Sequence, residues 1–148
     1  MLEPLYFYTK SGPHFALSNF APYGLEAEGC YWPTVEHFFQ AQKFLDAAYR
    51  ERVRKAATPK EARALGQSRA MPIRPDWDAI RDAVMLQALR LKFSRPEPRK
   101  ALLETGEHPL VEASPFDHYW GAGQDGSGQN RLGVLLQQVR AELREASD

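Results

Sequence analysis

The sequence predicts an α+β fold, mostly helical with short strands, in a single compact domain that covers residues 1–148. Apolar residues recur with helical spacing in residues 34–47, 77–93 and 131–146, whereas the β-prone runs are short and scattered. Strands and helices do not alternate as they do in a parallel βαβ fold. An apolar fraction of 43% and a charged fraction of 26% are typical of one globular domain.

The expected strands lie near the N-terminus and beyond the middle of the chain. Residues 5–9 are aromatic and β-prone, and Ser11-Gly12-Pro13 ends this strand. Residues 15–20 predict either a short strand or a packed loop. A second strand is expected over residues 24–31, and Leu110–Ala113 predicts another.

The helix expected over residues 34–47 places Glu36, Gln40 and Lys43 on one stripe, at spacings i, i+4 and i+7. The rest of this helix is largely apolar or aromatic, so it belongs inside the protein. Buried charge is costly unless it is paired or used. The segment alone leaves two interpretations open: Glu36 favours the start of the helix through the helix dipole, or the stripe lines a cleft.

Capping signals predict the later helices. Thr58-Pro59-Lys60-Glu61 has the spacing of a capping box, and Gly66 is the expected stop of that helix. Asp76 and Asn130 are the expected N-caps of the two long helices. These remaining helices are expected at residues 49–57, 58–65, 77–93, 96–104 and 131–146. The inward positions of the last helix are Leu132, Leu135, Leu136 and Val139.

Composition excludes several classes of protein. Nineteen basic and nineteen acidic residues give no net charge, which argues against a highly basic nucleic-acid binder but allows a local basic patch. The single cysteine, Cys30, excludes an intramolecular disulfide and a cysteine-rich zinc site, and the histidines form no tight metal pattern. We find no signal peptide and no run of about 20 apolar residues, so we expect a cytoplasmic protein.

A glycine-rich segment, residues 115–130, holds Asp117 and also Trp120, which stands directly before Gly121. A carboxylate and an indole beside such a loop suit a polar ring that must be stacked and hydrogen-bonded. The alternative is a turn in which Asp117 is an Asx cap and Trp120 covers the core. The glycines lack the context of a Rossmann fingerprint or a P-loop. Considered alone, Trp77 is expected to be a core residue.

In their order and spacing, several segments between about Phe15 and Arg140 together resemble the NADAR, or YbiA-like, family of N-glycosidases. The resemblance implies a compact, mostly helical α+β fold and hydrolysis of the bond between a ribose C1 and a nitrogen. The segments and residues that carry it are Leu17–Phe20, Trp32–His37, Gln40–Ala41, Lys43–Phe44, Asp76–Trp77, Met85, Lys92–Phe93, Leu102–Leu103, Thr105–Gly106, Leu110–Glu112, Asp117, Trp120–Gly123 and Gly128–Gly133.

The resemblance also implies the site. Glu36, Trp77 and Asp117 fall on the family's active-site positions, and Lys43 falls on the lysine of the same helical motif. Glu36 is expected to act as base and electrostatic stabiliser. Asp117 is expected to bind the base or the ribose hydroxyls, or to act as the acid. Lys43 is expected to contact the ribose oxygen or, if burial depresses its pKa, to form a Schiff base with open-chain ribose.

Further contacts with the substrate are expected. Trp77 and Trp120 would stack the heterocycle, and Asn19 and Gly121 would contact the ligand. Arg81 or Lys92 would hold a phosphate. No metal and no organic cofactor is expected.

Three functions remain open from the sequence. The expected substrate is a phosphorylated riboside, an aminopyrimidine ribosyl-phosphate intermediate of riboflavin biosynthesis. The first alternative is removal of ADP-ribose from guanine in modified nucleic acid. The second is a non-catalytic module that binds a nucleotide or ADP-ribose. No membrane partner is expected, and the sequence does not predict an oligomeric state.

Overall fold

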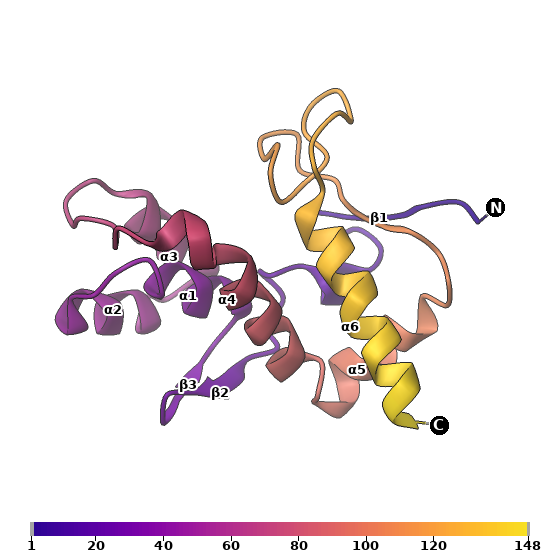
Figure 1. Cartoon of the computed structure of the whole chain (residues 1–148), viewed down its shortest axis with the longest axis horizontal. Helices are drawn as coiled ribbons and strands as arrows, with labels where there is room; N and C mark the ends of the chain where they lie inside the picture. Colours follow the sequence, from indigo (N-terminus) through magenta and orange to yellow (C-terminus); the bar gives the residue numbers. More distant parts are fainter. Residues whose placement is uncertain (1, 148) are drawn as a thin grey trace. The chain divides into compact units, whose positions relative to one another are not determined.

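The computed structural model describes residues 2–147, which hold six α-helices and four short strands (Figure 1). The predicted class, α+β and mostly helical, is confirmed. By its internal contacts the chain divides into two compact units. Unit 1 comprises Met1–Ala21 and Phe93–Asp148, and unit 2 comprises Pro22–Lys92. The prediction of a single domain stays a prediction.

Unit 2 is built around one short buried helix. Its elements are β2 (Leu25–Ala27), β3 (Cys30–Trp32), α1 (Val35–Ala41), α2 (Ala47–Arg54), α3 (Pro59–Gln67) and α4 (Trp77–Lys92). Helix α1 packs against α2, α3 and α4, and every one of its residues is buried. The expectation that this helix lies inside the protein is therefore confirmed.

Helix α1 is shorter than predicted. It ends at Ala41, and the Lys43 backbone N–H donates to Gln40 O in the turn that follows, at 3.3 Å. The placement of Lys43 on a continuing helix is therefore wrong. The cause lies a few residues on, where Asp46 Oδ1 accepts from Tyr49 N at 2.8 Å and caps the start of α2. A new N-cap requires extended backbone at Asp46, so the first helix must stop before it.

Thr34 and His37 hold the start of α1. Thr34 Oγ1 accepts from His37 N at 3.2 Å, which is an N-cap bond. Burial lowers the pKa of His37, which favours a neutral ring. Its Nε2 donates to Ala56 O at 3.0 Å, because a carbonyl oxygen can only accept. Nδ1 therefore accepts from the Thr34 hydroxyl, 2.8 Å away.

We expect Thr34→Val to lower the free energy of unfolding by about 2 kcal/mol, because it removes the cap and also leaves buried His37 Nδ1 without a donor. Thr58 is the matched comparison, since its hydroxyl caps α3 by accepting from Glu61 N at an exposed position. Thr58→Val should cost only about 1 kcal/mol. Urea denaturation of both variants measures the difference, and equal losses would contradict this account.

The single strand expected over residues 24–31 is instead an antiparallel hairpin. Strands β2 and β3 pair with Leu25 opposite Trp32. The two residues between them, Glu28 and Gly29, both have positive φ, 57° and 75°. Two-residue hairpin loops favour this conformation, but Asn or Asp is its usual first residue, so the Glu-Gly pair is a weak signal.

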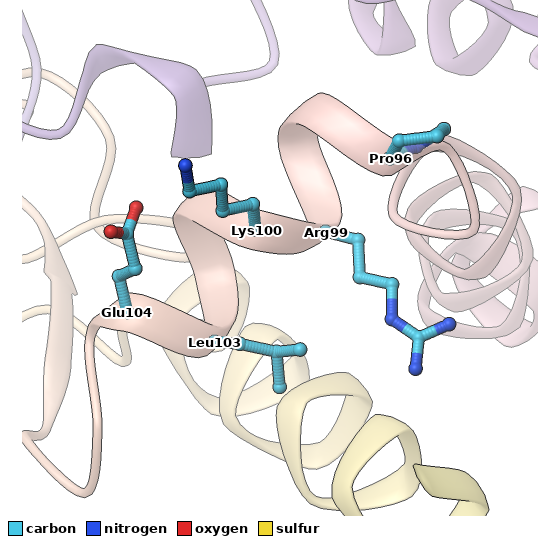
Figure 2. Close-up of a pocket in the computed structure, with 5 residues that line it drawn as sticks. All are labelled: Pro96, Arg99, Lys100, Leu103 and Glu104. Atoms are coloured by element: carbon cyan, nitrogen blue, oxygen red, sulfur yellow. The ribbon is translucent and has the colours of Figure 1, made fainter.

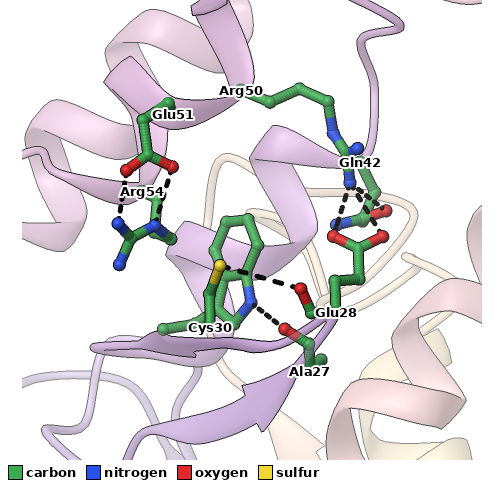
Figure 3. Close-up of polar contacts among 8 residues, drawn as sticks. Ala27, Glu28, Cys30, Gln42, Arg50, Glu51 and Arg54 are labelled. Atoms are coloured by element: carbon green, nitrogen blue, oxygen red, sulfur yellow. Dashed lines mark hydrogen bonds and ion pairs between the residues drawn. The ribbon is translucent and has the colours of Figure 1, made fainter. Parts of the chain in front are cut away.

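Contacts of the Glu28 carboxylate secure this strained turn. Its Oε1 accepts from Arg50 Nη2 at 2.7 Å and from Gln42 Nε2 at 3.4 Å (Figure 3). Trp32 Nε1 also donates across the hairpin to Ala27 O at 3.0 Å. The hairpin is thereby attached to α2 and to the residue after α1.

Unit 1 joins the N-terminal segment to the last part of the chain, from Phe93 on. Its elements are β1 (Leu5–Phe7), the 3₁₀ turn η1 (Phe15–Leu17), α5 (Pro96–Glu104), β4 (Leu110–Glu112) and α6 (Arg131–Ser147). Strands β1 and β4 run parallel, with Leu5 opposite Leu110. The predicted inward positions of α6 are confirmed as buried.

Asn130 does more than begin α6. Its Oδ1 accepts from Glu112 N at 3.0 Å and its Nδ2 donates to Leu110 O at 2.9 Å, so the side chain continues the ladder of β4. Its backbone carbonyl accepts from Val134 N at 3.1 Å, the first-turn bond expected of a helix start.

No helix within residues 2–147 combines the length and apolarity that a membrane crossing requires. The cytoplasmic location stays a prediction.

Candidate active site

The contact between α1 and α3 in unit 2 holds a nearly buried carboxylate. The Glu36 side chain is 4% exposed, whereas that of its partner Arg63 is 46% exposed. Glu36 Oε2 accepts from Gln40 Nε2 at 2.7 Å, one helical turn on, and from Arg63 Nε of α3 at 3.1 Å. The structure therefore satisfies the requirement that a buried charge be paired and hydrogen-bonded.

Lys43 lies beside this carboxylate and is partly buried. Its Nζ donates to Gly66 O at 3.4 Å. Burial lowers the pKa of Lys43; the Glu36 charge opposes that shift and the Arg63 charge adds to it. A lysine with a lowered pKa has a larger fraction of free amine at neutral pH, which suits either proton transfer or nucleophilic attack.

Gly66 does not end α3 as expected; it leaves space for the Gln40 side chain at the site. Helix α3 continues past it to Gln67. A Cβ at position 66 would lie 2.0 Å from Gln40 Oε1 and 2.8 Å from Gln40 Cβ. Only a glycine leaves room here for the side chain that donates to Glu36. Gln40 Oε1 itself is buried and takes no hydrogen bond within the part of the chain described.

Trp77 begins α4 and packs on α1. Its indole lies 5.0 Å from the Phe39 ring, centroid to centroid, and the residue is 7% exposed. Arg81, one turn later, is half-buried. Asp76, the expected N-cap, directs its carboxylate to Arg74 at 2.6 Å, and its backbone carbonyl accepts from Ile80 N. The stacking role of Trp77 and the substrate role of Arg81 stay predictions.

Lys92, at the end of α4, differs in burial from Arg81, the other candidate phosphate ligand. It is fully buried, and burial lowers its pKa to about 7. A buried amine that loses its proton near neutral pH is a poor anion ligand. Half-buried Arg81 is therefore the better candidate of the two.

In unit 1, Asp117 forms the turn that the sequence left as an alternative. Its Oδ1 accepts from Tyr119 N at 3.0 Å and from Trp120 N at 2.8 Å, which makes it an Asx cap. Within residues 2–147, its Oδ2 takes no hydrogen bond. Trp120 is half-buried and meets the Tyr119 ring edge-on, with centroids 4.9 Å apart.

Close packing accounts for the glycines of the same loop. A Cβ at Gly121 would lie 2.2 Å from Glu112 Oε2, and one at Gly123 would lie 2.4 Å from His118 Nδ1. The loop lies against β4, where Ala122 N donates to Glu112 O at 2.8 Å. Contact of Gly121 with a ligand stays a prediction, as does that of Asn19, which is buried after η1.

The structure thus brings Glu36 and Lys43 together in unit 2, while Asp117, Trp120, Gly121 and Asn19 belong to unit 1. Sequence reasoning missed Arg63 and gave Gly66 the wrong role. A signal was present: Ala62 and Gly66 are small residues at i and i+4, a pattern that lets two helices approach closely, and Arg63 follows the first of them.

Other features of the structure hold none of the predicted site residues. A shallow hollow of about 360 Å³ lies along α5 and is lined by Pro96, Arg99, Lys100, Leu103 and Glu104 (Figure 2). Within residues 2–147, no group of three or more His, Cys, Asp or Glu side chains is arranged to hold a metal ion.

Comparison with known proteins identifies the class. The model of the NADAR domain family matches residues 6–144, so the chain belongs to this family. N-glycosidase YbiA of Escherichia coli is 45% identical over 138 residues, which cover 93% of this chain and 86% of that protein. An N-glycosidase of Nostoc punctiforme is 44% identical over 144 residues, 95% of this chain and 92% of its own.

A solved structure and a longer relative agree with this. The NMR structure of E. coli YbiA matches with a TM-score of 0.89 and 42% identity, over 99% of this chain and 89% of that one. A protein of Vibrio vulnificus named as a riboflavin biosynthesis protein is 41% identical over 98% of this chain, which spans 40% of that protein. The resemblance inferred from the motifs is confirmed, and the chain is an N-glycosidase of the NADAR family.

Proposed function

We propose that this N-glycosidase hydrolyses the C1–N bond of a phosphorylated riboside, and that its substrate is an aminopyrimidine ribosyl-phosphate intermediate of riboflavin biosynthesis. The observation that carries the proposal is the nearly buried Glu36 carboxylate with Lys43 beside it. The name of the Vibrio vulnificus relative supports the choice of substrate.

The proposed chemistry assigns a role to each carboxylate. Cleavage of an N-glycoside builds positive charge at the anomeric carbon and negative charge on the departing nitrogen. Glu36 stabilises the first charge and takes a proton from the attacking water. Asp117 is the proposed acid or hydroxyl ligand, through the oxygen that the turn does not use.

Lys43 is proposed to act by its charge, as a contact for the ribose oxygen. The alternative step is a Schiff base: the free amine attacks C1 of the ring-opened riboside, the C1–N bond breaks and the aminopyrimidine leaves as its free amine, after which water hydrolyses the lysine Schiff base and releases ribose 5-phosphate. Trp77 and Trp120 are proposed to contact the heterocycle, and Arg81 the phosphate.

Incubation of the enzyme with both candidate substrates tests the proposal. With the aminopyrimidine ribosyl phosphate, mass spectrometry should detect ribose 5-phosphate and the free aminopyrimidine. An ADP-ribosylated guanine oligonucleotide should stay intact. Release of ADP-ribose from that oligonucleotide, with the small riboside untouched, would replace the proposal by the ADP-ribosyl-guanine alternative. Binding of either compound without turnover would favour a non-catalytic module.

A further inference from the structure

Two donors share one oxygen of Glu36. Gln40 Nε2 and Arg63 Nε both donate to Oε2, at 2.7 and 3.1 Å. Within residues 2–147, Glu36 Oε1 takes no hydrogen bond. One donor comes from α1 itself and the other from α3, which packs against it. The carboxylate is therefore held from two directions through a single atom.

We propose that Gln40 and Arg63 are positioning residues, which hold Glu36 through Oε2 and so reserve Oε1 for the reacting water and the sugar, while Gly66 provides the space that Gln40 needs. This inference rests on the proposed function, in which Glu36 is the catalytic carboxylate. Neither Gln40 nor Arg63 is assigned contact with the substrate.

Geometry gives the physical reason. Bonds from a guanidinium or an amide to a carboxylate are directional, and two of them on one oxygen fix the orientation of the group. The lone pairs of the other oxygen then point in a constant direction, which general-base catalysis requires. A misplacement of about 1 Å can lower a catalytic rate about 100-fold.

The contacts of Gly66 support the same arrangement. A side chain at position 66 would collide with Gln40 Oε1, Cδ and Cβ. Because the collision reaches Gln40 Cβ, rotation of the terminal amide alone does not relieve it. Gly66 O also accepts from Lys43 Nζ, so a single residue of α3 contacts both polar neighbours of Glu36.

The test separates charge from packing at position 63. The charged groups around Glu36 are Arg63 from α3 and Lys43 from the turn after α1, and the titratable but neutral His37 follows Glu36 on α1. Removing the Arg63 cation disfavours the ionised carboxylate, so the acid limb of kcat/KM should move to higher pH in Arg63→Gln. In the same variant kcat should fall about 10- to 100-fold with KM nearly constant. Arg63→Lys keeps the charge and should keep the acid limb of the wild type.

Two further variants complete the set. Gln40→Met keeps the length of the side chain and removes the donor, so kcat should fall about tenfold or more while KM stays constant. Arg50→Gln is the control, because it breaks a comparable arginine–glutamate pair at the exposed hairpin. It should leave both kcat and the acid limb unchanged.

The outcomes distinguish this inference from the proposed function. A wild-type enzyme that does not cleave the riboside refutes the proposed function. If the wild type is active, a shift of the acid limb in Arg63→Gln but not in Arg63→Lys supports the positioning role. Equal limbs in both variants, or a kcat in Arg63→Gln and Gln40→Met equal to that of the wild type, would overturn it.

Discussion

Glu36→Gln is expected to lower kcat by about 100-fold or more, with a melting temperature close to that of the wild type. The amide has the shape of the carboxylate and keeps an oxygen that can accept from Gln40, but it has no charge to stabilise the sugar cation and no basic oxygen. The stability should hold because Arg63, the partner left behind, is 46% exposed and can be solvated by water. Steady-state release of ribose 5-phosphate measures the change.

A matched control lies on the hairpin of the same unit. Glu28→Gln also removes a glutamate that pairs with an arginine, but at an exposed turn. Its kcat should equal that of the wild type. If Glu36→Gln were as active as Glu28→Gln, or if it lost activity only because it unfolded, Glu36 would be a structural residue.

Asp117→Asn is expected to lower kcat by about 100-fold while the loop around it keeps its conformation. Asparagine retains the Oδ1 that accepts from Tyr119 N and Trp120 N, so the Asx cap survives and only the charge and Oδ2 are lost. Asp117→Ala removes the cap as well and should lower the free energy of unfolding by about 1 kcal/mol. Kinetics and urea denaturation separate the two effects.

Asp125→Asn is the control for Asp117→Asn. Asp125 Oδ1 accepts from Ser127 N at 3.0 Å, so it forms a similar turn in the same glycine-rich segment. This variant should keep full activity. Full activity in Asp117→Asn together with lost stability in Asp117→Ala would show that Asp117 only shapes the loop.

Local signals in the sequence were sufficient for most helices. Helix α3 follows a capping box, α5 begins at a proline, and the amphipathic spacing of α6 gives its buried face. Each of these signals acts within a few residues. The end of α1 was predicted wrongly because Asp46, itself a cap, competes with continuation of the helix.

Contacts between distant residues were beyond local patterns. Strand β1 pairs with β4, which lies more than a hundred residues further along the sequence. The short β-prone runs do not specify this partner. At the site, the spacing of Glu36 and Gln40, one helical turn apart, predicts that they share one stripe, and their side chains form a hydrogen bond. Arg63 was missed because its role depends on how closely α3 approaches α1, which Gly66 permits.

We propose that Glu36 directs water to the anomeric carbon of a phosphorylated riboside. The two-substrate incubation tests it most directly when it is run in H₂¹⁸O and quenched with borohydride, which reduces the sugar before its oxygen exchanges. Intact mass of the protein in the same sample also reports any adduct on Lys43. We predict one ¹⁸O atom in the reduced sugar phosphate and none in the aminopyrimidine, with Glu36→Gln forming the labelled product about 100-fold more slowly. Label in the aminopyrimidine, or equal rates in the wild type and Glu36→Gln, would contradict the claim.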